Sequence, residues 1–180
     1  MKSYYYLLVP FFLFFIACTD ENQAQLPPAT QEGKNILGCL VNGEVFVAQG
    51  GRLGGTDDLS ISVSKTDVSL GSEAVGKHTN IEGSLVIYFN IDNIYTTENV
   101  KLINETEKIG RYTSSTGRVF LTGKDKYVGE FTISKLDTVN YIIAGTFWFD
   151  AVSDNGEVVE IRHGRFDIKD FCCLADPRYK

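Results

Sequence analysis

The sequence predicts an all-β fold: a single antiparallel β-sandwich or flattened barrel that ends in a C-terminal meander. Short segments in which apolar and polar residues alternate recur along the chain, and clusters of turn-forming residues separate them. An Asn-Gly pair between apolar residues marks a tight hairpin. No apolar stripe with helical spacing persists for three turns. These observations favour strands throughout the folded part.

The first predicted element is a hairpin in the segment CLVNGEVFV, residues 39–47. Its turn is Asn42-Gly43, which suits type I′ because both residues tolerate a positive φ. The register that this turn sets pairs Val41 with Glu44, Leu40 with Val45 and Cys39 with Phe46.

The middle of the chain continues the alternation. In LSISVS, residues 59–64, apolar side chains alternate with serines. In LVIYFNI, residues 85–91, one face carries Leu85, Ile87, Phe89 and Ile91. Residues 96–110 fit either a short helix or an extended excursion, and RVFLTG at residues 118–123 predicts a further strand.

The last third of the chain, residues 127–169, predicts a meander of four strands joined by short turns. Along residues 141–152 both faces are apolar, so we expect this strand to be central and covered on both sides. Trp148 is then expected in the core. If its face is open instead, Trp148 becomes the best candidate for a platform on which a sugar ring stacks.

The N-terminus has the layout of a secretory signal over residues 1–17. Lys2 precedes an apolar stretch that is too short for a membrane span, and a small residue, Ala17, stands before Cys18. The tetrapeptide at residues 15–18 resembles the bacterial lipobox, which implies that Cys18 is lipidated and begins the mature chain. The alternative is an ordinary signal peptide with a chance cysteine. A double or triple acyl anchor would hold the protein firmly at a membrane.

Residues 18–35 predict a disordered tether, because glutamines, acids and two prolines leave little apolar surface to bury. An all-β domain is expected at residues 36–180. Asp20 and Glu21 resemble the short acidic export signal of Bacteroidota lipoproteins, which implies the outer membrane, with the cell surface favoured over the periplasmic face. The sequence does not indicate an oligomeric state.

The charge pattern argues against a nucleic-acid partner. Loss of Lys2 with the leader leaves 16 basic and 23 acidic residues, a net charge of −7, and the basic residues form no long run. The expected partners are the membrane, through the lipid, and a glycan or a protein.

Two segments resemble a family of uncharacterised all-β lipoproteins from Bacteroidota. They are the VNGEVF hairpin at residues 41–46 and the GTFWFDAV, GEVVEI and GRFDI segments between residues 145 and 168. The resemblance implies a fold and a location in the cell envelope, and it implies no activity.

We expect no catalytic residues, no metal and no cofactor. The two histidines, His78 and His163, stand in separate predicted loops without cysteine or carboxylate at ligand spacing. The sequence contains neither a Gly-x-Ser-x-Gly elbow nor a His-Glu-x-x-His helix. The predicted function is therefore a non-catalytic binding or structural module. The alternative is a β-barrel carrier of a small apolar ligand, with a cavity lined by Phe89, Phe131 or Phe147.

Two surface features are candidate sites. Arg162, His163 and Arg165 form a cluster that could bind an anion or a sugar acid, and the alternative is a solvated turn beside acidic neighbours. The tripeptide at residues 137–139 resembles the O-glycosylation site of Bacteroidota, which marks Thr138 as a candidate acceptor.

Three cysteines remain once Cys18 carries lipid: Cys39, Cys172 and Cys173. The compartment outside the inner membrane permits disulfides. A bond from Cys39 to Cys172 or Cys173 would join the first and last strands, with a stabilisation of about 4 to 5 kcal/mol in the chain-entropy treatment. Three unpaired thiols are the alternative.

Overall fold

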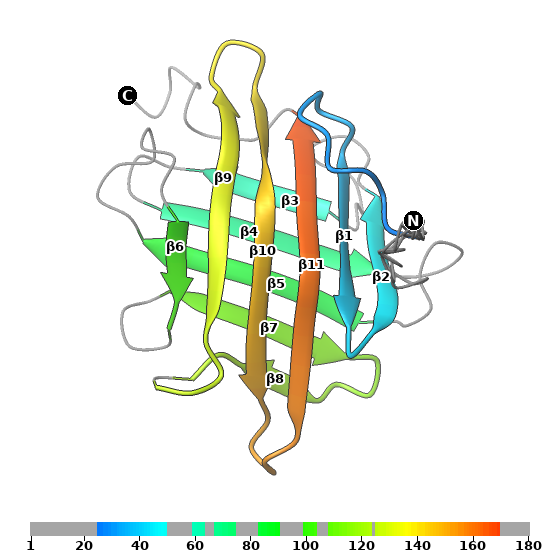
Figure 1. Cartoon of the computed structure of the whole chain (residues 1–180), viewed down its shortest axis with the longest axis vertical. Coiled ribbons are helices and arrows are strands. Elements are labelled where there is room, and N and C mark those ends of the chain that lie inside the picture. Colours follow the sequence, from blue (N-terminus) through cyan, green and yellow to red (C-terminus); the bar gives the residue numbers. More distant parts are fainter. Residues whose placement is uncertain are drawn as a thin grey trace, which may run out of the picture.

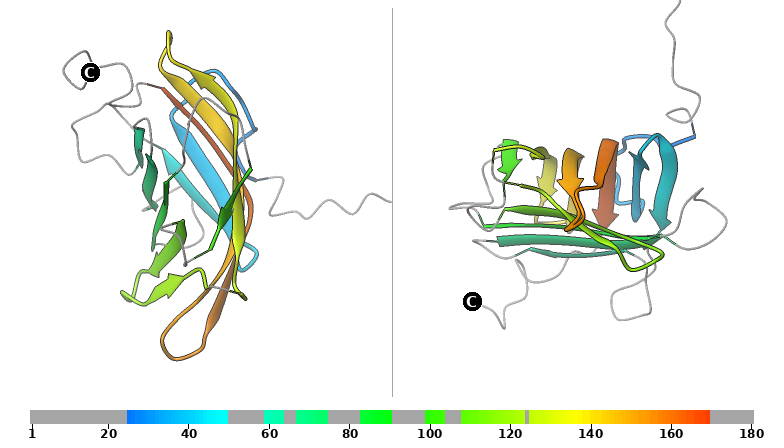
Figure 2. Two further views of the ribbon diagram at one scale, coloured as in Figure 1. Left: turned by 90° about the vertical axis from the view of Figure 1, so that its left-hand side faces the viewer. Right: turned by 90° about the horizontal axis from the view of Figure 1, so that it is seen from below.

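A computed structural model gives the fold. It describes residues 25–49, 59–63, 67–74, 83–90, 99–103, 108–123 and 125–169. Within these ranges every regular element is a β-strand, and the eleven strands form one antiparallel sheet. The sheet curls into a half-barrel whose two layers face each other (Figure 2), so the predicted all-β class is confirmed.

The layers differ in strand direction (Figure 1). The front layer contains β1 (Ile36–Val41), β2 (Glu44–Gln49), β6 (Asn99–Leu102), β9 (Gly129–Asp137), β10 (Ile142–Val152) and β11 (Val158–Lys169). Across its back run β3 (Leu59–Val63), β4 (Asp67–Ala74), β5 (Gly83–Asn90), β7 (Ile109–Ser114) and β8 (Val119–Leu121). The strand order is β2-β1-β11-β10-β8-β7-β5-β4-β3, and β9 lies between β10 and β6.

The first hairpin has the predicted register. β1 and β2 pair Val41 with Glu44, Leu40 with Val45 and Cys39 with Phe46. The turn residues Asn42 and Gly43 have φ angles of 51° and 84°, as a type I′ turn requires. The extended alternative for residues 96–110 also holds in the described residues, which form β6, a bridge between Ile103 and Lys108, and the start of β7.

The hydrophobic core lies between the two layers. Leu85 and Ile87 of β5 are fully buried and share a face, as predicted, whereas the side chain of Phe89 and all of Ile91 lie outside the described part. Among the residues whose side chains the structure describes, the front layer contributes to this core Leu37, Cys39, Phe46, Phe131, Ile143, Phe147, Phe149, Ile161 and Phe166.

Three core phenylalanines lie directly opposite glycines on neighbouring strands. The pairs are Gly145 with Phe166, Phe147 with Gly164, and Phe149 with Gly129. A Cβ atom on any of these glycines would lie 2.7 Å or less from an atom of the opposite phenylalanine. The close atoms are ring carbons at Gly145 and Gly164 and the Cβ atom at Gly129, so the glycines allow close packing against the phenylalanines.

The C-terminal meander has three strands, where the sequence predicts four. The two segments on either side of His163 form the single strand β11. Its register shifts against β10 and against β1 at this point, and His163 has a φ of 53°, so the predicted turn is a β-bulge inside a strand. A bulge inserts one residue without ending the ladder, which is why a turn-like sequence continues as a strand.

Residues 25–35 correct the prediction of a disordered tether that extends to residue 35. We call this segment the strap, because it runs along the outer face of the front layer (Figure 1). Leu26 of the strap is buried in a small apolar cluster with Leu40, Val45 and Val47. Residues 18–24 and the signal segment 1–17 lie outside the described residues.

Asp167 of β11 holds the strap in place. Its buried carboxylate accepts hydrogen bonds from Thr30 Oγ1 at 2.6 Å and from the backbone nitrogens of Glu32, Gly33 and Lys34 at 3.0, 2.7 and 3.2 Å. Burial alone would raise the pKa of Asp167, but the four hydrogen bonds outweigh it and lower the pKa below its ordinary value. A strap with little apolar surface is ordered because a distant carboxylate satisfies its backbone.

Cys39 is a free cysteine whose side chain is completely buried in the core. Burial raises the pKa of its thiol, because the thiolate would lose its hydration. Both proposed disulfide partners, Cys172 and Cys173, lie outside the described residues. In the described part, no helix has the length and apolar character needed to cross a membrane.

Candidate functional site

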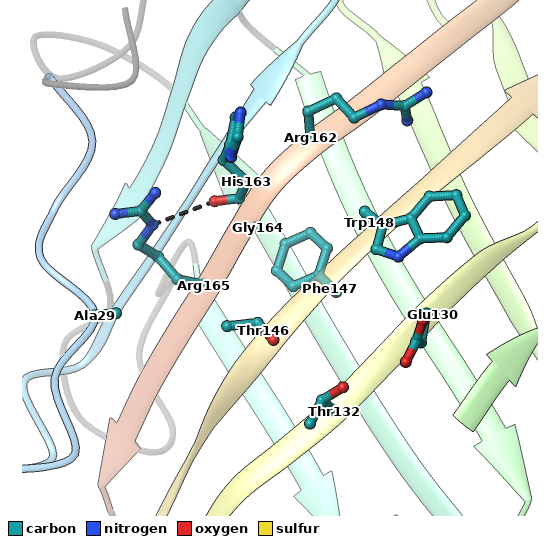
Figure 3. A pocket seen from close by; sticks show the side chains of 10 residues that line it. All are labelled: Ala29, Glu130, Thr132, Thr146, Phe147, Trp148, Arg162, His163, Gly164 and Arg165. Carbon is teal, nitrogen blue, oxygen red and sulfur yellow. Dashed lines mark hydrogen bonds between the residues drawn. The ribbon is translucent and has the colours of Figure 1, made fainter. Parts of the chain in front are cut away.

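An open pocket lies on the outer face of the front layer, over β9, β10 and β11 (Figure 3). Its volume is about 580 Å³. Ala29 of the strap stands at one side, so the ordered strap forms part of the wall. The full lining is Ala29, Glu130, Thr132, Thr146, Phe147, Trp148, Arg162, His163, Gly164 and Arg165.

Strand register brings the polar lining together. Thr132, Thr146 and Arg165 lie opposite one another on β9, β10 and β11. Two residues further along, Glu130 of β9 pairs with Trp148 of β10. Since alternate residues of a strand point to the same face, both rows face outwards, and the phenylalanines between them face the core.

Trp148 is exposed, which corrects the expectation that it lies in the core. The residue retains 38% of its accessible surface. The back layer covers only the opposite face of β10, where Phe147 and Phe149 are buried. The strap covers the outer face elsewhere, around Leu40 and Ile142, so β10 is covered on both sides along only part of its length.

Arg162 stands over Trp148 and is electrically balanced. Its guanidinium carbon lies 5.7 Å from the centre of the indole ring, and Nη2 lies 2.6 Å from Asp150 Oδ1 and 3.7 Å from Glu160 Oε2. Nη1 also donates to the carbonyl oxygens of Phe149 and Ile161. Arg162 is therefore held by two acids, and its guanidinium makes a cation–π contact with the indole ring.

Arg165 differs from Arg162 because no carboxylate in the described part of the chain pairs with it. Nε donates to the carbonyl oxygen of His163 at 3.2 Å (Figure 3), and Nη1 donates to the carbonyl oxygen of Pro27 at 3.2 Å. Burial lowers the pKa of the Arg165 guanidinium from its ordinary value. The strap side of the pocket thus carries a partly desolvated positive charge that is not neutralised by a described residue.

Three further lining side chains are available to a ligand. Among the described residues, none forms a hydrogen bond or ion pair with the side chains of Glu130, Thr146 or His163. Thr132 donates its hydroxyl proton to Asn99 Oδ1 at 2.7 Å and keeps its lone pairs. The pocket therefore offers donors and acceptors around one flat apolar ring.

All four residues that the sequence marks as candidate binding residues line this one pocket: Trp148, Arg162, His163 and Arg165. The sequence did not single out Glu130, Thr132, Thr146 or Ala29. The alternation of GEFTIS in β9 would have found two of them, had its register with β10 been known. Cys18 lies outside the described residues.

Thr138 is exposed in the turn between β9 and β10, at the end of the hairpin, and it does not line the pocket. Asp137 beside it accepts hydrogen bonds from the side chain and backbone of Asn140 and from the backbone of Val139. These hydrogen bonds, with those of Asn140 the larger contribution, lower the pKa of Asp137. The O-glycosylation of Thr138 stays a prediction.

Two of the three phenylalanines expected to line the cavity of a carrier, Phe131 and Phe147, are engaged in packing, and the side chain of Phe89 lies outside the described residues. Phe131 stacks on Phe166 with ring centres 5.0 Å apart, and Phe147 packs against Gly164. In the described ranges, no group of three or more His, Cys, Asp or Glu side chains is placed so that it could hold a metal ion.

Comparison with known protein families matches residues 54–167 to a family described as a domain of unknown function, DUF6252. The match contains β3 to β10 and nearly all of β11, and so all of the pocket except Ala29. Searches among curated proteins and among solved structures found no match. The chain belongs to the DUF6252 family.

Proposed function

We propose that the protein is a membrane-anchored lipoprotein of the cell envelope, and that its β domain is a non-catalytic module that binds a glycan at the Trp148 pocket. The lipobox-like segment at residues 15–18 supports the anchor. The observation that carries the binding role is the exposed indole of Trp148 among polar side chains in an open pocket.

The pocket suits a sugar for physical reasons. The apolar face of a pyranose ring packs on an indole, while its hydroxyls need hydrogen-bond partners in the plane of the ring. Glu130, Thr146 and His163 supply such partners around Trp148. Three strands about 4.8 Å apart span roughly 10 Å, which accommodates one or two sugar rings. A protein partner would more often use a larger and flatter patch.

The docked strap also shortens the link to the anchor. The sequence alone suggests a tether of 17 residues beyond Cys18, which could reach about 60 Å. Six residues, 19–24, lie between Cys18 and residue 25, the first described residue of the strap, so the Cα atoms of residues 18 and 25 are about 25 Å apart at most. The proposed anchor would therefore hold the pocket near the membrane surface.

Replacement of Trp148 with alanine is expected to weaken glycan binding about tenfold, because an aromatic stacking contact contributes about 1.5 kcal/mol. The measurement is binding of the mature chain, residues 18–180, to an array of bacterial and host oligosaccharides, followed by calorimetry on the bound glycans.

Tyr141→Asn is the matched control. Tyr141 is as exposed as Trp148, at 39% against 38%, but lies outside the pocket, and asparagine tolerates its φ of 55°. We expect unchanged binding for this variant. Absence of any glycan binding, or equal binding by Trp148→Ala and the wild type, would overturn the proposed function.

A further inference from the structure

We propose that the glycan bound at this pocket is acidic: a sugar carboxylate pairs with Arg165 while a ring of the same glycan stacks on Trp148. This inference rests on the proposed function and names the chemical class of its ligand.

The two arginines of the pocket differ in whether carboxylates already neutralise their charge. Arg162 is already neutralised by Asp150 and Glu160, so it offers little to an anion. Arg165 has no carboxylate partner among the described residues, and its guanidinium donates to two neutral carbonyl oxygens. A guanidinium carries five N–H donors, so these contacts leave donors unused. A partly buried guanidinium without a carboxylate partner favours a negatively charged ligand.

The spacing of the two residues fits one glycan. Arg165 lies opposite Thr146, two residues from Trp148 along β10. One strand spacing and two residues of rise place the two backbones about 8 Å apart. In Figure 3 Trp148 and Arg165 stand at opposite sides of the pocket, with Thr146 between them. A pyranose ring that carries a carboxylate, or two linked rings, spans such a distance.

Glu130 fixes the direction in which the ligand lies. It pairs with Trp148 across β9 and β10, and its carboxylate has no described partner. A ligand carboxylate at that side would meet a like charge, whereas hydroxyl groups there would donate to Glu130. The acidic group is therefore expected on the strap side, where the bulge also presents the exposed imidazole of His163.

The test uses paired oligosaccharides that differ only in charge. The pairs are trigalacturonate and its methyl ester, a glucuronate trisaccharide and its methyl ester, and sialyllactose and its methyl ester. Calorimetry with the mature chain is expected to show at least one acidic member that binds about tenfold or more tightly than its neutral partner, with a preference that declines as salt increases.

Variants at Arg165 test whether this residue pairs with the carboxylate of the ligand. Arg165→Gln should abolish the preference for the acidic member, and Arg165→Lys should keep most of it, because lysine retains the charge. Since Arg165 also contacts Pro27 of the strap, thermal melting of both variants shows whether the fold is intact.

The other outcomes distinguish failure of the acidic preference from failure of the proposed function. If acidic and neutral members bind equally and Trp148→Ala weakens both, the acidic preference is wrong and the proposed function stands. If the glycans of the array bind but every acidic member of the panel fails, the acidic preference is wrong as well. If no glycan of any kind binds, the proposed function and this inference fail together.

Discussion

Replacing Asp167 with asparagine is expected to lower the free energy of unfolding by about 3 to 5 kcal/mol, because four donors converge on its buried carboxylate. Asparagine offers the four donors one oxygen, and its own NH₂ group would face at least one backbone N–H, that of Gly33 if the amide oxygen takes the Oδ2 position. Urea denaturation of the mature chain measures the loss, and faster amide hydrogen exchange in residues 25–35 would show that the strap is released.

The pH dependence gives this prediction a second readout. The folded-state pKa of Asp167 lies below its value in the unfolded chain, so its contribution to stability is complete above the ordinary value of about 3.9. The contribution is lost as the pH falls through the folded-state pKa. The difference in stability between wild type and Asp167→Asn should therefore be constant near neutrality and shrink in acid.

Asp137→Asn is the control for Asp167→Asn, because Asp137 also accepts several hydrogen bonds but lies at the solvent-accessible end of β9, beside the turn. Its loss of stability should be much smaller than that of Asp167→Asn, because solvent screens the interactions of Asp137. Equal losses for the two variants, or a pH-independent difference for Asp167→Asn, would contradict the role given to the buried carboxylate.

Replacing Gly145 with alanine is expected to destabilise the domain by about 3 kcal/mol, the upper end for overpacked cores, or to prevent folding. The new methyl group would lie 2.0 Å from the carbonyl oxygen of Thr132 and 2.7 Å from the ring of Phe166. Both neighbours belong to hydrogen-bonded strands on either side of β10, so neither can retreat easily. Thermal and urea unfolding, together with the soluble yield, measure the effect.

Gly156→Asn provides the comparison for Gly145→Ala. Gly156 has a φ of 86° in the turn between β10 and β11, and no atom lies within 4 Å of the position that a Cβ atom would take there. Asparagine tolerates this conformation, so we expect a change of at most about 1 kcal/mol. A Gly145→Ala variant as stable as Gly156→Asn would show that the phenylalanine and glycine pairs are not closely packed.

The parts of the fold that follow from local chemistry could be predicted from the sequence. Asn42-Gly43 sets a turn type, and the turn type sets the register of β1 against β2. The alternation in β5 places Leu85 and Ile87 on the buried face. Both inferences need only neighbouring residues, because a two-residue turn and a period of two are local properties.

The parts that depend on distant residues could not be predicted. The strap has the composition of a disordered segment, and it is ordered by Asp167, which lies more than 130 residues away. The segment around His163 has turn chemistry, yet hydrogen bonding to β1 and β10 on both sides keeps it within β11. In the strap and in the segment around His163, contacts with residues distant in the sequence determine the structure.

The candidate site could be predicted from the sequence only in part. The sequence singled out Trp148 and the cluster of Arg162, His163 and Arg165, but it could not show that they share a pocket or that Trp148 is open to solvent. Trp148 is exposed because the strap packs on a different part of the outer face of the front layer, around Leu40. Glu130 and Thr132 enter the site through the pairing of β9 with β10, whose register shifts beside Gly145.

The most direct test of the glycan site uses the fact that Trp148 is the only tryptophan of the chain. Its fluorescence therefore reports on the pocket alone. Titration with the acidic oligosaccharide that binds best should change the emission of Trp148 and protect it from quenching by acrylamide, with the same dissociation constant as calorimetry gives. Binding that leaves both emission and quenching unchanged would place the ligand elsewhere and contradict the central claim.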